Sequence, residues 1–368
     1  MWTSVLLTTL SMSGISVALA VVILVAERFL NDYGTVKVDI NGGAKTLEAQ
    51  GGASLLSTLA SHQVFLPSAC GGKATCGLCK VKVLEGGGTL LPTEEPYLTP
   101  AERAAGMRLA CQLKVKRDLR IEVPEALFSI QEFKTRIERI DDLTYDIKGY
   151  RFALLDPPAI SFKAGQYVQL YSEPYGQVKE SVFRAYSMAQ PPSDEKAVEL
   201  YLRLVPDGVV TTWAHTRLKV GDAVRLSGPY GEFYLRGNCK DLVMIAGGSG
   251  LAPIRSLVYD IVEKGLPYTM TFFFGAVSKR DLYALDEFHG IAAKHPNFRF
   301  VPALSKPAPD DGWTGEVGLI TEVVDRHVPD AVDREAYLCG SPGMLNACIN
   351  VLTKKGFGND RIFFDKFA

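Results

Sequence analysis

The sequence has almost no net charge, because 40 lysines and arginines balance 41 aspartates and glutamates over 368 residues and leave −1. It contains no block of basic residues, so we expect no nucleic-acid partner. Histidine is scarce as well. The five histidines are scattered without ligand spacing, and none is assigned to a metal or to catalysis. The seven cysteines are an odd number with uneven spacing, which favours ligation over a disulfide framework.

Charged residues are wholly absent from residues 3–26. A helix over this range spans roughly 36 Å, enough for a hydrocarbon core of ~30 Å, so we expect a retained transmembrane helix in a lipid bilayer. A signal peptide is the alternative, but no basic residue precedes Arg28. Arg28, Lys37 and Lys45 follow the span, and the positive-inside rule then predicts a single-pass protein of the inner (cytoplasmic) membrane with its soluble domains in the cytoplasm.

The rest of the chain divides into three patterns, with no internal repeat. Residues 34–126 predict a small β-rich domain around crowded cysteines. Residues 130–235 hold short alternating strands between glycine- and proline-rich turns, which predict an antiparallel β-barrel. Residues 238–368 alternate apolar strands with helical stretches, as an α/β domain with a parallel sheet does. The expected fold class is therefore multidomain.

The segment SACGGKATCGLC places three cysteines within ten residues, and a fourth follows in RLACQ. The candidate metal ligands are Cys70, Cys76, Cys79 and Cys111. This asymmetric spacing suits a [2Fe–2S] cluster. Zinc sites usually pair two C-x-x-C hooks, and only one is present here. Buried free cysteines are the other alternative. Gly71, Gly72 and Gly77 would let the backbone curl and aim N–H groups at sulfur.

This loop resembles those of plant-type ferredoxins, except that five residues rather than four separate the first two cysteines. Together with LLPTE and RLACQ it resembles the ferredoxin domain of the F subunits of sodium-translocating NADH:quinone reductases. Those proteins have the same spacing and begin with one membrane helix. The resemblance implies a β-grasp α+β ferredoxin domain over residues 34–126 that holds a [2Fe–2S] cluster.

Arg184, Tyr186 and Ser187 form an R-x-Y-S motif at the end of a predicted strand. It resembles the flavin signature of the ferredoxin–NADP reductase superfamily; for the motif alone, a solvated strand-end arginine is the alternative. The resemblance implies FAD, with Arg184 on its pyrophosphate, Tyr186 on the isoalloxazine ring and Ser187 near N5. GVVTT fits a second phosphate loop, and GPYGEF ends the barrel. These two segments add Gly208, Thr211, Thr212, Gly228 and Gly231 as FAD-binding candidates.

A glycine-rich turn, GGSGLAP, lies between the strand LVMIA and a helix, where backbone amides and the helix dipole can receive a dinucleotide pyrophosphate. Its candidates are Gly247, Gly248, Gly250 and Pro253. In the resembled superfamily a C-G-x-P segment lies beside the nicotinamide ring. Cys339, Gly340 and Pro342 match it here, and an ordinary buried cysteine is the alternative for Cys339.

The terminal IFFDKFA resembles the family's end, where an aromatic covers the flavin face; Phe367 is the matching residue, and simple packing is its alternative. The resemblance thus makes Cys339, Ser187 and Phe367 the catalytic candidates. Cys239 and Cys348 are interpreted as structural. The segment GAVSKRDL could hold a 2′-phosphate, but a very similar segment occurs in the NADH-using F subunits, so we expect NADH.

The resemblance implies a membrane-anchored NADH dehydrogenase that passes electrons from NADH through FAD and the cluster to sister membrane redox subunits and quinone. One departure supports an alternative. The F subunits have a long insertion where EPYGQVKESVF is short, and the barrel half resembles phenol and methane monooxygenase reductases. The alternative is therefore a membrane-tethered reductase that serves a di-iron oxygenase component. An electron-transfer or assembly module without turnover is a third hypothesis, against which the intact motifs argue.

Overall fold

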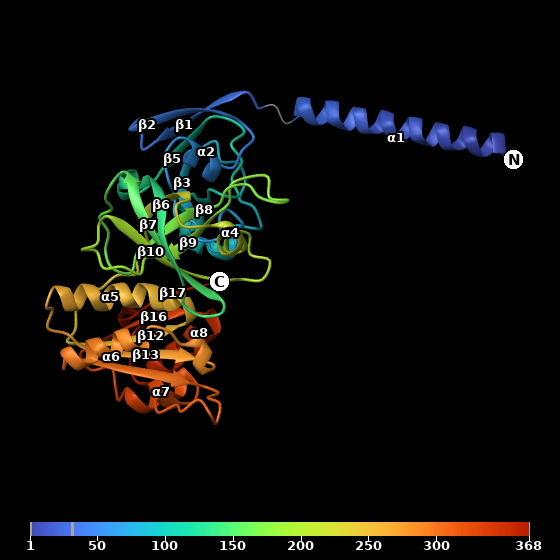
Figure 1. Cartoon of the computed structure of the whole chain (residues 1–368). Helices are drawn as coiled ribbons and strands as arrows, with labels where there is room; N and C mark the ends of the chain where they lie inside the picture. Colours follow the sequence, from blue (N-terminus) through green and yellow to red (C-terminus); the bar gives the residue numbers. More distant parts are fainter. Residues whose placement is uncertain (1, 31–32, 368) are drawn as a thin grey trace. The chain divides into compact units, whose positions relative to one another are not determined.

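The computed structural model describes residues 2–30 and 33–367, without the side chains of residues 2–5, 7, 8, 23–30, 126 and 129. The chain forms two compact units, Met1–Ser129 and Ile130–Ala368 (Figure 1). The last predicted domain ends at residue 368, which lies outside the described residues. The predicted domain boundaries stay predictions.

The first element is helix α1 (Trp2–Leu30), which contains the predicted membrane span at residues 3–26. Part of that span, residues 3–5, 7, 8 and 23–26, has side chains outside the described ones. Across the described part of the chain, no helix is both long and apolar enough to cross a membrane.

A five-stranded mixed sheet forms the body of the first unit. Its elements are β1 (Thr35–Ile40), β2 (Lys45–Gln50), α2 (Leu55–Ser61), β3 (Lys80–Glu85), η1 (Glu95–Tyr97), α3 (Pro100–Ala104), β4 (Met107–Leu109), β5 (Leu119–Glu122) and η2 (Glu125–Ser129). The strand order is β2-β1-β5-β3-β4, with β1 and β5 parallel. The alternation of TVKVDI has its cause in the core, because Val36, Val38 and Ile40 are buried. An α+β domain is thereby confirmed.

The second unit begins with a sheet whose neighbouring strands are all antiparallel. Its elements are β6 (Gln131–Asp142), β7 (Ile147–Asp156), β8 (Tyr167–Tyr171), β9 (Phe183–Ser187), β10 (Ala197–Arg203), α4 (Val209–Arg217) and β11 (Ala223–Tyr230). They lie in the order β10-β7-β6-β11-β8-β9. A bridge between Met188 and Leu200 joins the segment after β9 to β10, so the sheet curls back on itself. The predicted antiparallel barrel is confirmed.

A six-stranded parallel sheet follows. Its elements are β12 (Asp241–Gly247), η3 (Gly248–Gly250), α5 (Leu251–Glu263), β13 (Thr269–Ala276), η4 (Lys279–Asp281), α6 (Leu285–Lys294), β14 (Phe298–Leu304), β15 (Glu316–Val317), α7 (Ile320–His327), β16 (Arg334–Gly340), α8 (Pro342–Lys354), η5 (Asn359–Arg361) and β17 (Ile362–Lys366). The order β15-β14-β13-β12-β16-β17 reverses direction between β12 and β16. Residues of α5 and α6 pack in one apolar cluster and residues of α7 and α8 in another, so helices cover both faces. The carboxyl ends of β12 and β16 at this reversal are where such sheets bind ligands.

Candidate functional site

The four cysteines of the first unit form two pairs of thiols. Cys70 Sγ and Cys76 Sγ are 3.4 Å apart, and the thiols of Cys79 and Cys111 share a hydrogen bond. Two sulfurs on one tetrahedral metal with bonds of about 2.3 Å would be roughly 3.8 Å apart, so the first pair suits a shared metal. Within residues 2–30 and 33–367, no three metal-binding side chains gather around a single ion position. Two pairs therefore fit a two-iron cluster, with two thiolates on each iron, better than one zinc ion.

Within each pair one thiol donates a hydrogen bond to the other, which lowers the pKa of the acceptor and raises the pKa of the donor. The pKa of Cys70 is lowered to about 3, first because Cys76 donates its thiol proton, and then through the N–H groups of Thr75 and Cys76. The pKa of Cys111 is lowered to about 7, mainly because Cys79 donates to it. Backbone N–H groups thus point at sulfur, as the glycine-rich loop predicts. Gly77 is required for this turn: its φ is +67°, and a Cβ there would lie 2.8 Å from the Tyr97 ring.

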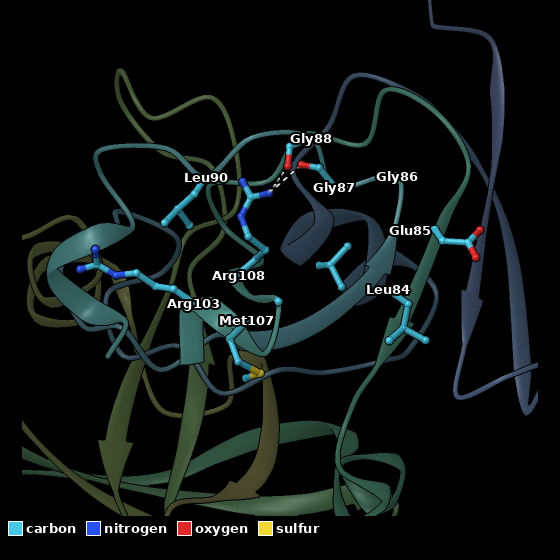
Figure 2. Close-up of a pocket in the computed structure, with 11 residues that line it drawn as sticks. Leu84, Glu85, Gly86, Gly87, Gly88, Leu90, Arg103, Met107 and Arg108 are labelled. Carbon is cyan, nitrogen blue, oxygen red and sulfur yellow. Dashed lines mark hydrogen bonds between the residues drawn. The ribbon is translucent and has the colours of Figure 1, made fainter. Parts of the chain in front are cut away.

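A buried ion pair fixes the strand that leads to Cys111. Glu94 is fully buried and accepts hydrogen bonds from Arg108 Nη2 at 2.6 Å and from Leu109 N at 2.8 Å. Burial raises the pKa of Glu94, but these hydrogen bonds outweigh it and hold the pKa below its usual range. Arg108 also donates to the Gly87 carbonyl at 2.6 Å, beside a cavity of about 380 Å³ (Figure 2). The lining of this cavity includes none of the four cysteines.

In the barrel, the R-x-Y-S strand and the GPYG segment lie on either side of one strand. Tyr167 of β8 pairs with Ser187 of β9 and with Tyr230 of β11. A Cβ on Gly231, whose φ is +102°, would lie 2.9 Å from the Tyr167 ring, so this close approach requires glycine. The two predicted FAD segments therefore lie at one level of the same barrel wall. Tyr186 packs against the barrel core.

Two further FAD candidates extend from the barrel. Arg184 is half-buried, and its Nη1 donates to the Phe183 carbonyl at 2.7 Å rather than to another predicted site residue. Gly208 caps α4, and a Cβ there would lie 2.4 Å from Thr211 Oγ1. That hydroxyl accepts from Val205 N at 3.2 Å, which tightens the loop before the helix, while Thr212 lies in its first turn. The loop thus presents the N-terminus of α4, a suitable position for a phosphate.

The glycine-rich turn and the C-G-x-P segment meet at the reversal point of the parallel sheet. A Cβ on Gly250 would lie 2.3 Å from the Cys339 carbonyl oxygen, so only glycine fits there. Met344 lies against both segments, because a Cβ on either Gly247 or Gly340 would come within 2.7 Å of its side chain. Pro253 is buried in the first turn of α5, Pro342 opens α8, and Gly248 has a φ of +57°. The structure thus brings together the candidates for the dinucleotide pyrophosphate and those for the nicotinamide ring.

Strand β9, which ends at Ser187 and is called the flavin strand here, and strand β16, which contains Cys339 and is called the nicotinamide strand, both approach one carboxylate that the sequence reasoning missed. Asp365 of β17 pairs with Cys339 of β16. Burial raises the pKa of Asp365 to about 6, and the hydroxyl of Ser187 lowers it in part. Ser187 Oγ is itself buried and makes no hydrogen bond of ordinary geometry, so it lies near Asp365 without a well-formed bond. Such a buried, unpartnered hydroxyl is what a bound flavin would satisfy.

The two-residue period of a strand could have placed Asp365 on the same side as Phe367, but not beside Cys339. Along β17 the side chains of Phe363, Asp365 and Phe367 face inward, while Phe364 and Lys366 are exposed. Phe367 is half-buried, and its N–H donates to the Gly340 carbonyl at 3.0 Å, so the terminal aromatic lies beside the C-G-x-P segment. Burial raises the pKa of the Cys339 thiol well above its usual value, with the Asp365 charge as a second cause. Cys339 is therefore a neutral thiol at neutral pH.

Sequence reasoning also missed a second residue, Arg203 of β10, because nothing distinguishes it from other strand-end arginines. Its Nε donates to Asp146 at 2.7 Å, and its Nη1 lies 3.6 Å from the place of a Cβ on Gly248. The guanidinium is half-exposed and faces the glycine-rich turn. Its position suits a dinucleotide pyrophosphate.

The side chains that could hold a 2′-phosphate, those of Ser278, Lys279 and Arg280, already interact with other groups of the protein. Ser278 Oγ donates to Asp281 at 2.6 Å, and Lys279 Nζ donates to the Asp311 carbonyl at 2.7 Å. Arg280 stacks on the Tyr145 ring at 4.4 Å. The Asp281 carboxylate would repel a 2′-phosphate. This agrees with NADH as the expected dinucleotide.

The chain matches three protein families along its length: the 2Fe-2S iron-sulfur cluster binding domain over residues 38–116, the oxidoreductase FAD-binding domain over 134–234 and the oxidoreductase NAD-binding domain over 244–349. Fold and site together define an iron–sulfur flavoprotein oxidoreductase that uses NADH, FAD and a [2Fe–2S] cluster. The chain is 36% identical to the F subunit of the Na(+)-translocating NADH-quinone reductase of Pseudomonas aeruginosa, and 36% identical to its counterpart in Methylococcus capsulatus, over 97% of both chains in each case. The chain belongs to the family of these F subunits.

Solved structures share the fold over most of the chain. The Amycolatopsis reductase GcoB has a TM-score of 0.72 at 29% identity and covers 90% of this chain and 99% of its own. A ferredoxin reductase in carbazole 1,9a-dioxygenase has a TM-score of 0.69 at 28% identity, and the match covers 91% of this chain and 99% of that reductase.

The alignment to the Pseudomonas relative runs over 395 positions, longer than the chain itself, so that relative contains residues this chain lacks.

Proposed function

We propose that this chain is the NADH-oxidising component of a membrane NADH:quinone reductase and delivers electrons to partner subunits of that complex. The observation that carries the proposal is the meeting of the flavin strand and the nicotinamide strand at Ser187, Cys339 and Asp365. When bound, FAD would accept one hydride, which carries two electrons, from NADH, and a [2Fe–2S] cluster would take electrons one at a time.

The cluster ligands are the four paired thiolates of Cys70, Cys76, Cys79 and Cys111. The N–H groups of the loop stabilise their charge, and the Glu94–Arg108 pair keeps the approach to Cys111 rigid. Because cluster potentials depend on hydrogen bonding to sulfur, this backbone geometry sets the energy at which the site accepts electrons.

The flavin is held along one wall of the barrel. Arg184 and the α4 N-terminus neutralise its pyrophosphate, Tyr186 orients the ring, and Ser187 offers its unpartnered hydroxyl to the reactive edge. The FAD-binding loops are completed by Gly208, Thr211, Thr212, Gly228 and Gly231.

The dinucleotide binds across the reversal point of the parallel sheet. Its pyrophosphate meets the glycine-rich turn and Arg203, while its nicotinamide end lies at Cys339. Neutral Cys339 packs without repelling the ring, Phe367 covers the flavin face, and Asp365 holds a proton below about pH 6 beside Ser187. The other residues that contact the dinucleotide in this proposal are Gly247, Gly248, Gly250, Pro253, Gly340 and Pro342.

Helix α1 anchors the chain in the inner membrane as a single pass, with the catalytic domains in the cytoplasm. Its described large apolar side chains between Leu6 and Val22 are each more than half exposed, and the sequence from 3 to 26 carries no charge. An exposed apolar surface of this length needs a lipid or protein cover. Removal of residues 1–30 should release the protein from membranes into the soluble fraction without changing its flavin content.

A second candidate is a membrane-tethered reductase for a di-iron oxygenase. The short segment before the flavin motif favours it, and the likeness to a ferredoxin reductase in carbazole 1,9a-dioxygenase supports an oxygenase reductase without pointing to a di-iron partner. Both candidates share the route from NADH to the cluster and differ only in the acceptor.

The test is purification of the full chain from membranes in mild detergent, identification of the subunits that accompany it, and anaerobic addition of NADH. We expect NADH to bleach the flavin absorbance, and we expect other membrane redox subunits to copurify with the chain. A di-iron oxygenase in their place would favour the second candidate. A flavin that NADH leaves oxidised would contradict both and favour the module without turnover.

A further inference from the structure

Helix α5 connects the dinucleotide turn to the flavin strand. It begins directly after the glycine-rich turn, and its second turn contacts the segment that follows R-x-Y-S. Arg255 Nη1 donates to the Ala189 carbonyl at 2.9 Å, and Ser256 Oγ donates to the Gln190 carbonyl at 2.7 Å. Two neighbouring side chains of one helix thus bind two neighbouring carbonyls, two and three residues beyond Ser187.

The Arg255 side chain is held in place from three sides. Its Nε donates to Glu287 of α6 at 2.6 Å, its Nη1 lies 3.7 Å from Glu199 of β10, and its guanidinium stacks on the Tyr259 ring at 4.8 Å. Only 16% of the side chain is exposed. A buried charge of this kind is costly unless it is paired, and a planar guanidinium meets several partners that a lysine cannot meet together.

The flavin segment is gripped from the barrel side as well. Ala189 N donates to the Glu199 carbonyl at 2.8 Å, and Glu199 N donates to Gln190 Oε1 at 2.8 Å. Both Ala189 and Gln190 are almost fully buried. These hydrogen bonds hold the segment against the barrel. Arg255 and Ser256 connect the same segment to the helix that follows the dinucleotide turn.

We propose that Arg255 is a positioning residue for hydride transfer, which fixes the distance between the dinucleotide turn and the flavin edge at Ser187. This inference rests on the proposed function. The Arg255 side chain bonds to Ala189, Glu199 and Glu287 rather than to the glycine-rich turn or to β9, so its loss should leave NADH binding largely intact while the reacting atoms become misaligned. A displacement of about 1 Å is enough to slow a reaction roughly 100-fold.

The experiment compares the full-length wild type with Arg255→Met, Ser256→Ala and Ser193→Ala by anaerobic stopped-flow, at saturating FAD. Ser193 Oγ donates to Glu263 at 2.5 Å and also links the barrel to α5, but at an exposed position beyond the buried flavin segment, so Ser193→Ala is the matched control. We expect Arg255→Met to lower the limiting rate constant of flavin reduction by about 10- to 100-fold. Its dissociation constant for NADH should change less than about threefold, and a primary isotope effect with NADH deuterated at the transferred position should increase. Ser256→Ala should change the rate in the same direction by a smaller factor.

Three results would overturn the inference. The first is an Arg255→Met rate equal to that of the wild type. The second is a loss explained wholly by weaker NADH binding, and the third is an equal loss in Ser193→Ala. If Arg255→Met does not retain FAD, Ser256→Ala decides alone, and an unchanged limiting rate in that variant refutes the positioning role. A wild-type flavin that NADH does not reduce would instead refute the proposed function, and the inference with it.

Discussion

Asp365→Asn should stabilise the second unit at neutral pH, because it removes a partly buried carboxylate that has no ion pair with a cation. The pKa of Asp365 is raised from 3.8 to about 6, first by burial. At 1.36 kcal/mol for each pKa unit, ionisation of this group in the folded state costs about 3 kcal/mol. An asparagine amide is also costly to bury, so we expect a net gain of about 1–2 kcal/mol.

The sign of the pH dependence follows from the direction of the shift. The folded state binds the proton more tightly, so the contribution is fully favourable below about pH 4 and is lost as the pH rises to about 6. The wild type therefore becomes less stable across this window, whereas Asp365→Asn does not. The gap between the two should be small at pH 5 and complete at pH 8.

The assay is thermal unfolding at saturating FAD, since bound ligand also raises the melting temperature. A gain of 1–2 kcal/mol in a unit of this size corresponds to about 3–6 °C at pH 8. Asp360→Asn, at an exposed position just before β17, is the control and should change little. A lower melting temperature for Asp365→Asn at pH 8, or the same gap at pH 5 and pH 8, would refute the assignment of a partly buried carboxylate without a cation beside it.

Three other substitutions test separate parts of the molecule. Cys76→Ser should abolish the visible absorption and the paramagnetic signal of the cluster while NADH still bleaches the flavin; loss of flavin reduction as well would contradict the separation of the two compact units. Asp281→Asn should lower the KM for NADPH by about tenfold, because the carboxylate that accepts from Ser278 no longer repels a 2′-phosphate; an unchanged ratio of NADPH to NADH activity in steady-state kinetics speaks against this. Glu94→Gln should destabilise the first unit by about 3–5 kcal/mol, because Arg108 remains buried without its partner, and cluster bleaching on heating measures the effect; a midpoint within the error of the wild type would exclude it.

Matched controls exist for each of these. Cys348→Ser changes a buried cysteine with no neighbouring motif and should keep both chromophores. Glu102→Gln breaks a partly exposed ion pair with Lys80 in the same unit and should shift cluster loss much less than Glu94→Gln does. Asp286→Asn removes a charge on α6 outside the Ser278 turn and should leave the dinucleotide preference unchanged.

The fold could be predicted from the sequence because each domain has a strong local pattern. TVKVDI alternates because one side of β1 is buried, and LVMIA is continuously apolar because both faces of the parallel sheet are covered. The cysteines and glycine-rich turns were also visible, since thiolates and tight turns need particular residue types at fixed spacing. The membrane span at 3–26 and the individual ligand roles stay predictions.

The position of Asp365 beside Cys339 could not be predicted from the sequence, because it depends on which strands pair and in which register. Asp365 lies at the candidate site only because β17 pairs with β16 so that Asp365 is opposite Cys339. A slip of one residue would turn Asp365 outward and place Lys366 against the thiol, which would put a cation where a neutral or negative group now lies. The N–H of Phe367, bound to the Gly340 carbonyl, holds this register at its end. The terminal residues therefore take part in backbone pairing, whereas a search for motifs detects only the terminal aromatic residue.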